Sequence, residues 1–453
     1  MARTRSVFVC QSCGYESPKW AGRCPECGNW NTFSEEAVVH EKSVRTAPRG
    51  VSSQPIPMTE IKEADDKRLS TTLEEFDRVL GGGIVPGSVI LVGGAPGMGK
   101  STLLLQIGLR LAEKGLRILY VSGEESPRQI RMRADRLTGV SERFFLLSET
   151  DVESIAEAMK QNKPDLAVVD SIQTVFTPQL DSLPGNVSQV RVCGHALTAV
   201  AKEEQIPLFL VGHVTKEGGM AGPRVLEHLV DTLLFLEGDE QHIYRLLRSM
   251  KNRFGSTHEV GIFEMTERGM IEVKSPSEFL LSERLPGMSG TAVTVNLEGT
   301  RPILVEVQAL VSHSGYGIPQ RTATGVDQRR LSILLAVLEK REGLKFSTQD
   351  VFVNAAGGFR LSEPGADLAV VAALVSSAKD IPIESKTCFV GEIGLTGEVR
   401  GISQIDKRIA EAERMGFQRL VIPKINVKNL RKKPSIEVTG VKTVGEAIRI
   451  LGG

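Results

Sequence analysis

The sequence predicts an α/β protein whose central domain carries a parallel sheet, with a small cysteine module before it and an α+β domain after it. Three observations lead to this prediction. Four cysteines fall within residues 1–34, short apolar runs alternate with helical stretches over residues 69–274, and a different αβ pattern occupies residues 275–453. The alternation of apolar runs and helical stretches over residues 69–274 is typical of parallel sheets covered by helices on both faces.

Composition and charge narrow the class of protein. Lys and Arg (55) balance Asp and Glu (55), so no global field attracts the chain to nucleic acid or membrane, and a polyanion would have to meet local basic clusters. No apolar run reaches the length of a membrane span. The basic N-terminus lacks the apolar stretch of a signal peptide, and six cysteines in such a chain indicate reduced thiols. We expect a cytoplasmic protein with no membrane partner.

The cysteine module, residues 1–34, contains two CxxC pairs separated by ten residues. Two such pairs can close a tetrahedral zinc site, whose ligands here would be Cys10, Cys13, Cys24 and Cys27. In so short a segment bound Zn²⁺ would replace a hydrophobic core, because its binding free energy becomes folding free energy. A redox pair and free thiols are the alternatives. Four cysteines leave no open position for chemistry, so we interpret the site as structural, in contact with either DNA or a protein.

Residues 35–68 are predicted to be a linker, because they are polar, hold three prolines and show no sustained period. The central domain, residues 69–274, then begins with a strand–helix–strand unit. Further buried strands are expected where apolar runs end in Asp170 and His213, with a helix between them. The expected segments are SVILVGG (88–94), STLLLQIGLRLAEKG (101–115), RILYVSGEE (117–125), DLAVVDS (165–171), RVCGHALTAVAKEE (191–204) and IPLFLVGH (206–213).

The last domain, residues 275–453, is expected to mix strands and helices. Runs rich in Val, Ile and Leu predict its strands, and apolar residues at a period of 3.6 predict its helices. The expected strands are TAVTVNLEG (291–299), PILVEVQALV (302–311) and TCFVGEIGL (387–395), and the expected helices are RRLSILLAVLEKREG (329–343) and ISQIDKRIAEAERMG (402–416).

One stretch of the central domain matches the phosphate-binding pattern G-x4-G-K-[ST] and lies between an apolar strand and a helix, the context that this motif requires. Backbone N–H groups of the loop and the helix N-terminus would hold the phosphates of ATP. Lys100 would reach the β- and γ-phosphates, and Ser101 would bind Mg²⁺. The predicted nucleotide-binding residues are Gly94, Ala95, Pro96, Gly97, Met98, Gly99, Lys100, Ser101 and Thr102.

Polar residues lie at, or just after, the carboxyl ends of three other predicted strands, which is the edge where open α/β sheets bind ligands. Asp170 is placed to hold Mg²⁺ through water, or else to act as an N-cap for the next segment. Glu124 and Glu125 are candidates for the group that orients and deprotonates the attacking water. We favour Glu125, although the sequence does not decide between them. His213 would sense the γ-phosphate; a half-buried structural histidine is the alternative.

The segment Lys251-Asn-Arg253-Phe-Gly255 stands at a strand end before a turn. Lys251 and Arg253 are two residues apart, so on a strand they point to the same face. Two such cations suit the role of an arginine finger that acts on a neighbouring subunit's nucleotide. That role would require an oligomer; a basic hairpin tip is the alternative.

Together these features resemble known protein families over nearly the whole length of the chain. LGGGIVPGSVILVGGAPGMGKSTLLLQ resembles the core of RecA-family ATPases, and the KxR pair resembles the fingers of hexameric DnaB-type helicases. The order of cysteine motif, ATPase core, KNRFG and last domain is similar to the RadA (Sms) family of bacterial DNA repair proteins. The resemblance implies a RecA-like P-loop core, a hexameric ring, single-stranded and branched DNA as partners, and joint action with the RecA recombinase.

The last domain resembles the proteolytic domain of Lon proteases, through GEIGLTGEVRGI and LVIPKINVKNL. Lon uses a serine nucleophile and an activating lysine. Gly365 stands where the family pattern places the serine, Asp406 stands in the lysine position, and Lys407 is one residue off. We therefore expect a Lon-like scaffold without peptidase activity. The basic stretch of residues 428–433 either faces DNA or is solvated surface.

The residues thus favour an ATP hydrolase with ATP, Mg²⁺ and Zn²⁺ as cofactors, and the resemblance implies that it translocates on DNA as a ring. Its expected role is recombinational DNA repair, as a helicase that promotes branch migration of intermediates made by RecA. The alternatives are an ATP-regulated peptidase, an ATP-switched clamp that binds DNA or RecA without moving, and an RNA helicase. Translocation polarity, ring size and the preferred DNA structure stay open.

Overall fold

A computed structural model of the chain describes residues 5–11, 14–38, 57, 68–137, 139–213, 223–238, 244–315 and 319–451. It divides into two compact units, Met1–Val273 and Lys274–Gly453. The first unit begins with a small three-stranded antiparallel sheet in the order β2-β1-β3. These strands are β1 (Arg5–Cys10), β2 (Glu16–Ser17) and β3 (Phe33–Val38).

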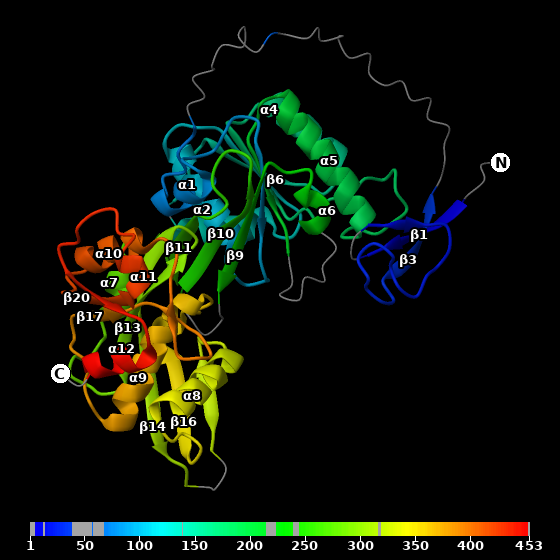
Figure 1. The fold of residues 1–453 in the computed structure, drawn as a ribbon. Coiled ribbons are helices and arrows are strands. Elements are labelled where there is room, and N and C mark those ends of the chain that lie inside the picture. Colours follow the sequence, from blue (N-terminus) through cyan, green and yellow to red (C-terminus); the bar gives the residue numbers. More distant parts are fainter. Residues whose placement is uncertain are drawn as a thin grey trace. The chain divides into compact units, whose positions relative to one another are not determined.

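A nine-stranded sheet forms the centre of the first unit (Figure 1), in the order β12-β11-β10-β9-β4-β8-β7-β5-β6. The six strands from β9 to β6 are parallel, and the hairpin strands β10 to β12 extend the sheet with antiparallel pairing. Their bounds are β4 (Val89–Gly93), β5 (Ile118–Ser122), β6 (Phe144–Ser148), β7 (Leu166–Asp170), β8 (Leu208–Val211), β9 (Thr232–Gly238), β10 (Tyr244–Asn252), β11 (Val260–Thr266) and β12 (Gly269–Glu272).

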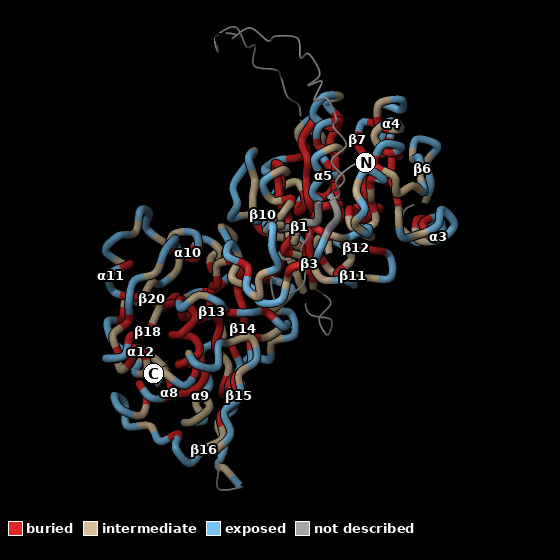
Figure 2. Tube along the Cα trace, turned by 90° about the vertical axis from the view of Figure 1, so that its right-hand side faces the viewer, coloured by how far each residue is buried: buried red, intermediate tan, exposed pale blue. Residues whose placement is uncertain are grey.

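Helices cover both faces of this sheet, as the apolar runs predicted. Alternate residues of β4 belong to different apolar clusters: Ile90 and Val92 pack with α1, α2 and α3, whereas Val89 and Leu91 pack with α4, α5 and α6. The sheet is therefore buried on both faces by two apolar clusters, which is why β4 is apolar throughout; buried residues concentrate in the interior of each unit in Figure 2. The helices are α1 (Glu74–Leu80), α2 (Lys100–Glu113), α3 (Pro127–Leu137), α4 (Val152–Asn162), α5 (Val187–Glu203) and α6 (Pro223–Glu227).

The second unit contains a seven-stranded mixed sheet in the order β15-β16-β14-β13-β17-β20-β21. Helix α10 packs on it through Ile405 and Ile409, which share an apolar cluster with Val293 and Val295 of β13. The strands are β13 (Thr291–Glu298), β14 (Arg301–His313), β15 (Arg321–Thr324), β16 (Gln349–Ala355), β17 (Thr387–Phe389), β18 (Glu392–Ile393), β19 (Val399–Arg400), β20 (Arg419–Pro423) and β21 (Glu437–Val441). The helices are α7 (Pro276–Leu281), α8 (Gln328–Glu342), α9 (Asp367–Lys379), α10 (Ile405–Arg414), α11 (Lys424–Val427) and α12 (Val444–Leu451).

Local signals explain where helices begin and end. Asp327 caps α8 by accepting a hydrogen bond from the backbone N–H of Arg330 at 2.8 Å, and the helix stops at Gly343, whose φ is 69°. The predicted strand 387–395 is instead two short strands, β17 and β18, which pair in different sheets. Among the residues that the structure describes, no helix is long and apolar enough to span a membrane.

Candidate active site

The phosphate-binding loop connects β4 to α2 at the carboxyl end of the parallel sheet. Gly94 has a φ of 151°, and a Cβ there would lie 2.3 Å from the carbonyl oxygen of Leu236. Gly99 has a φ of 95°, and its Cβ would lie 2.3 Å from Cε of Met265. Both positions therefore require glycine. The loop leads directly into α2, whose first residues are Lys100, Ser101 and Thr102.

The ammonium group of Lys100 lies inside this loop. Its Nζ donates to the carbonyl oxygens of Gly94 and Ala95, both at 2.9 Å, and the residue is 3% exposed. Burial lowers the pKa of Lys100, while the carboxylates of Asp170 and Glu124 raise it. The ammonium group of Lys100 therefore interacts electrostatically with these two carboxylates at this edge of the sheet.

Four of the predicted residues stand at the ends of strands along this same edge: Gly94 after β4, Glu124 after β5, Asp170 at the end of β7 and His213 after β8. Glu124 Oε1 accepts a hydrogen bond from Ser171 Oγ at 2.5 Å and lies 3.5 Å from His213 Nε2. Because the strands are parallel, their carboxyl ends bring these side chains together from separate parts of the sequence.

Asp170 is held by a residue that the sequence patterns did not single out. The hydroxyl of Tyr120 donates to Asp170 Oδ2 at 2.6 Å. Burial, together with the charge and hydrogen bond of Asp170, raises the pKa of Tyr120 well above its ordinary value. The only sequence signal for this pair was a tyrosine within an otherwise aliphatic strand. Ser101, Asp170 and Glu124 supply oxygen donors, which suit Mg²⁺.

Glu125 has different surroundings from Glu124. Its Oε2 pairs with NH1 of Arg133 on α3, and its backbone N–H donates to Ser122 Oγ at 3.0 Å. Arg133 also reaches Thr102 Oγ1, at 3.5 Å. The structure therefore places Glu124, and not the Glu125 that the sequence favoured, beside Ser171 and His213.

Lys251 and Arg253 lie at the opposite edge of the sheet. β10 ends at Asn252, which pairs with Thr232, and Thr232 in turn pairs with Ile90 at the amino end of β4. Arg253 comes directly after the strand, and the register shifts between Ser249 and Lys251, so the simple strand alternation that we expected does not hold there. Lys251 Nζ donates to the carbonyl oxygen of Glu227 at 2.6 Å.

The cysteine module brings three of the four predicted ligands together. The sulfur atoms of Cys10, Cys24 and Cys27 lie within 4.8 Å of one another, and those of Cys10 and Cys27 are 3.7 Å apart. Two thiolates bound tetrahedrally to Zn²⁺ are about 3.8 Å apart, given Zn–S bonds of about 2.3 Å, so these residues fit zinc. Cys13 lies outside the described residues. Both pairs are followed by a glycine of positive φ, Gly14 and Gly28, as expected for two equivalent turns.

The second unit has no serine–lysine pair at the position that the Lon resemblance indicated. Gly365 lies beside Glu363, which forms a bidentate ion pair with the fully buried Arg408 through contacts of 2.7 and 2.6 Å. Asp406 Oδ1 accepts from the backbone N–H of Arg431 at 3.2 Å. Lys407 Nζ instead lies 3.4 Å from the carbonyl oxygen of Thr300.

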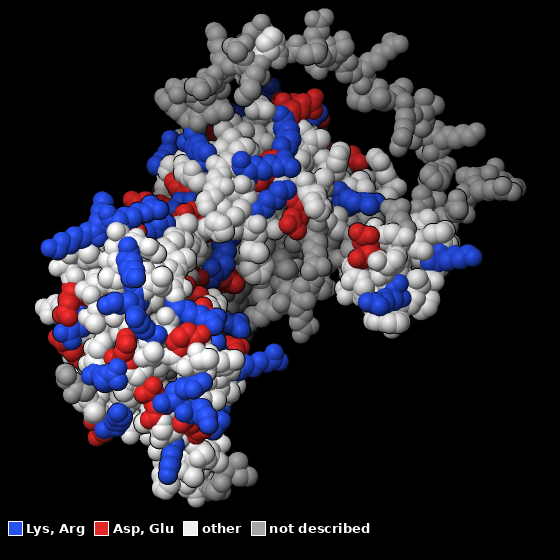
Figure 3. Space-filling model, in the orientation of Figure 1, with Lys and Arg blue, Asp and Glu red and all other residues white. Residues whose placement is uncertain are grey.

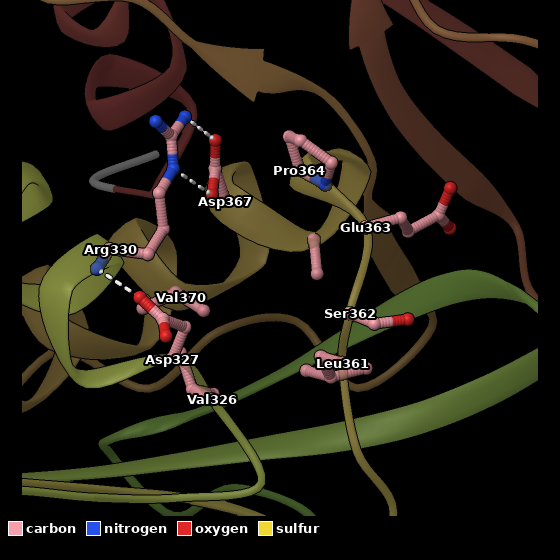
Figure 4. A pocket seen from close by; sticks show the side chains of 10 residues that line it. Val326, Asp327, Arg330, Leu361, Ser362, Glu363, Pro364, Asp367 and Val370 are labelled. Atoms are coloured by element: carbon pink, nitrogen blue, oxygen red, sulfur yellow. Dashed lines mark hydrogen bonds and ion pairs between the residues drawn. The ribbon is translucent and has the colours of Figure 1, made fainter. Parts of the chain in front are cut away.

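A pocket of about 230 Å³ lies next to this position (Figure 4), where Arg330 and Asp367 point toward one another. Arg330 Nε donates to Asp367 Oδ1 at 2.9 Å, and a further guanidinium nitrogen donates to the carbonyl oxygen of Ile393 at 2.7 Å. Burial raises the pKa of Asp367, and the hydrogen bonds from Arg330 and Ile393 lower it. The guanidinium of Arg330 and the carboxylate of Asp367 in the pocket therefore bind each other.

Basic and acidic side chains are interspersed over the surface seen in Figure 3, in agreement with the zero formal charge. The basic stretch lies between α11 and β21, and its four cations are exposed: Lys428, Arg431, Lys432 and Lys433. A polyanion would have to use such local clusters.

A P-loop at the carboxyl end of a parallel sheet, with carboxylates on the adjacent strands, defines the first unit as a P-loop ATPase domain of RecA-like architecture. The AAA domain family model matches residues 56–219, which agrees with this class. The rubredoxin metal binding domain model matches residues 8–35, and the C-terminal proteolytic domain of Lon protease (S16) matches residues 335–450. The predicted fold class is confirmed.

Full-length relatives then identify the family. The chain is 52% identical to the DNA repair protein RadA of Bacillus subtilis (strain 168), over 100% of both chains, and 50% identical to that of Listeria monocytogenes, over 99% and 98%. The chain belongs to the RadA family of DNA repair proteins, as the resemblance predicted. Two solved structures are similar to 46% of this chain. The RadB recombinase is 25% identical to it with a TM-score of 0.37, and the match covers 100% of that structure's chain. A KaiC-like protein from Pyrococcus horikoshii OT3 is 19% identical with a TM-score of 0.39, and the match covers 99% of its chain.

Proposed function

We propose that the protein is a DNA-stimulated ATPase that forms a ring, expected to be a hexamer, and moves along DNA as a helicase. In this proposal it acts in the cytoplasm on single-stranded and branched DNA. Together with the RecA recombinase, it promotes branch migration of recombination intermediates. Membership of a DNA repair family and a RecA-like ATPase domain support the role in recombinational repair.

The position of Arg253 is the main support for the proposed ring. Its backbone N–H donates to the carbonyl oxygen of Asp231, one residue before β9, whereas the P-loop follows the far end of β4. Gly94 is four positions after Ile90, which pairs with Thr232, so the two edges are about 13 Å apart along the strand. Arg253 cannot serve its own P-loop from there, but an exposed cation at this edge can serve the P-loop of an adjacent subunit.

Within the ATP site we assign roles from the contacts of each side chain. Lys100 would bind the β- and γ-phosphates, and Ser101 and Asp170 would hold Mg²⁺, whose charge would stabilise the negative charge on the phosphates. Glu124 orients and deprotonates the attacking water, because it lies beside Ser171 and His213 at the strand edge. His213 contacts this glutamate and can transmit the loss of the γ-phosphate. Glu125 positions α3 through Arg133.

We further propose that the cysteine module binds one structural Zn²⁺ and that the Lon-like unit is a scaffold without peptidase activity. Glu363 and Arg408 bind each other beside Gly365, the position of the nucleophile, and Asp406 at the lysine position accepts from the backbone of Arg431, which supports a unit without a serine–lysine pair there. Incubating the protein with casein, with and without ATP, tests this assignment; cleavage would contradict it. The domain boundaries proposed are 1–34, 35–68, 69–274 and 275–453.

The deciding experiment is ATP-dependent unwinding of a forked DNA duplex by the native protein, Lys100→Ala and Arg253→Ala. We expect the native protein to separate the strands and both variants to bind DNA without separating them. Lys114→Ala is the matched control, because Lys114 is an exposed residue at the other end of α2. If the native protein hydrolyses ATP and binds DNA but never separates strands, the clamp function replaces the motor. Substituting a forked RNA duplex distinguishes an RNA helicase.

A further inference from the structure

Tyr120 and Asp170 form a hydrogen bond between two strands of the central sheet. Tyr120 belongs to β5 and pairs in register with Val168 of β7, two residues before Asp170. Residues two apart on a strand share a face, so the tyrosine ring can extend diagonally from β5 to the carboxyl edge of β7. Its hydroxyl thereby reaches Asp170 Oδ2 at 2.6 Å.

The rest of the tyrosine side chain needs no hydroxyl. The residue is 1% exposed and belongs to the apolar cluster beneath α2 and α3. Its ring stacks on Phe144, with centroids 5.9 Å apart and planes at 30°. A phenylalanine would make the same apolar contacts, so the hydroxyl serves only its hydrogen bond with Asp170.

This hydrogen bond restricts the carboxylate of Asp170. Oδ2 is engaged by Tyr120, and within the described residues no side chain or backbone group donates to Oδ1. A carboxylate with one oxygen fixed keeps the other at a defined position. Mg²⁺ demands near-ideal octahedral geometry, and partners that orient a metal-binding carboxylate affect metal affinity strongly.

We propose that Tyr120 is a positioning residue that orients Asp170 for Mg²⁺ at the ATP site. This inference rests on the proposed function, because it takes Asp170 as the Mg²⁺-binding carboxylate. Tyr120 itself does not touch nucleotide or metal; it acts through Asp170. Loss of its hydroxyl should therefore weaken metal binding while leaving nucleotide binding without metal unchanged.

The test compares native protein with Tyr120→Phe, Asp170→Asn and the control Tyr15→Phe, which removes a phenol hydroxyl from the cysteine module. Mn²⁺ serves as the metal probe, and its dissociation constant in the presence of a non-hydrolysable ATP analogue is measured by electron paramagnetic resonance. ADP affinity in EDTA and the melting temperature are measured for each protein. The Mg²⁺ concentration for half-maximal ATP hydrolysis is determined separately from kcat.

For Tyr120→Phe we expect Mn²⁺ binding to weaken about tenfold, the lower end of what loss of a ligand-orienting partner causes. The half-maximal Mg²⁺ concentration should rise in parallel, while kcat at saturating Mg²⁺ and ADP binding in EDTA stay near native values. If Asp170→Asn weakens Mn²⁺ binding and Tyr120→Phe does not, Tyr120 only packs and the inference is wrong. If neither variant weakens it, the assignment of Asp170 itself fails, and this inference fails with it.

Discussion

Arg253 and Lys202 share one buried carboxylate, that of Asp231. Arg253 NH1 lies 3.0 Å from Asp231 Oδ1, and Lys202 Nζ lies 3.0 Å from each of its two oxygens. Asp231 is 2% exposed, whereas the Arg253 side chain is 53% exposed. The guanidinium of Arg253 is therefore paired with Asp231 although more than half of the side chain is exposed, and Lys202 would still neutralise Asp231 if Arg253 turned toward a neighbouring subunit.

This arrangement predicts complementation between two inactive variants. Arg253→Ala keeps an intact P-loop and Lys100→Ala keeps an intact finger, so rings containing both should recover ATP hydrolysis that each variant lacks. An arginine finger contributes about 10³–10⁵ in rate, which makes partial recovery easy to measure. The two variants are co-expressed with different affinity tags and purified over both.

Arg268→Ala is the control for that experiment, because Arg268 is an exposed arginine in the turn between β11 and β12 and should be dispensable. Recovery no greater than the sum of the separate variants, in doubly tagged rings, would show that Arg253 does not act across subunits.

The two adjacent glutamates should behave differently when neutralised. Glu124→Gln should lower kcat about 10²–10⁴-fold, the usual contribution of a general base, while ATP still binds. Glu125→Gln should leave kcat within one order of magnitude of native, because it loses only its ion pair with Arg133. Single-turnover hydrolysis and equilibrium binding of ATP measure the two effects. A larger loss of kcat in Glu125→Gln would reverse the assignment.

Zinc content should depend on all four cysteines of the module. The native protein is expected to hold one zinc ion per chain, and Cys13→Ser should lose it as completely as Cys24→Ser. The physical reason is that Zn²⁺ supplies roughly 10–16 kcal/mol in such small modules, which lack a core of their own. Metal analysis of the purified proteins measures this, with Cys193→Ser, a buried cysteine of α5, as control. Full zinc content in Cys13→Ser would exclude it as a ligand.

The ion pair of Glu363 and Arg408 should matter for stability. Arg408 is fully buried and also donates to the carbonyl oxygens of Val295 and Ser403. Replacing it with alanine leaves Glu363 without its cation, a change that costs about 3–5 kcal/mol for buried pairs. Thermal or urea unfolding of Arg408→Ala should show this loss. Arg400→Ala breaks an exposed pair with Glu398 and should unfold like the native protein; equal stability of both variants would contradict the prediction.

Much of the fold and part of the site could be predicted from local sequence. The P-loop is eight consecutive residues, two of whose glycines, Gly94 and Gly99, are required by a positive φ and by nearby atoms, and the two CxxC turns are equally local. Apolar runs such as residues 89–93 mark strands buried on both faces, which is why the parallel sheet was predictable. The strand end and turn at residues 251–255 were also predictable, whereas the division of residues 387–395 into two strands was not, because pairing partners decide it.

The sequence by itself determined which chemistry the chain carries: a phosphate loop, thiolates for zinc, and carboxylates at strand ends. Only the tertiary structure decided which groups meet. Glu124 and Glu125 are adjacent, and the packing of α3 and the end of β8 directs one toward Arg133 and the other toward His213. Tyr120 reaches Asp170 from 50 residues away because β5 and β7 are neighbours. Such contacts depend on strand order, which no local pattern encodes.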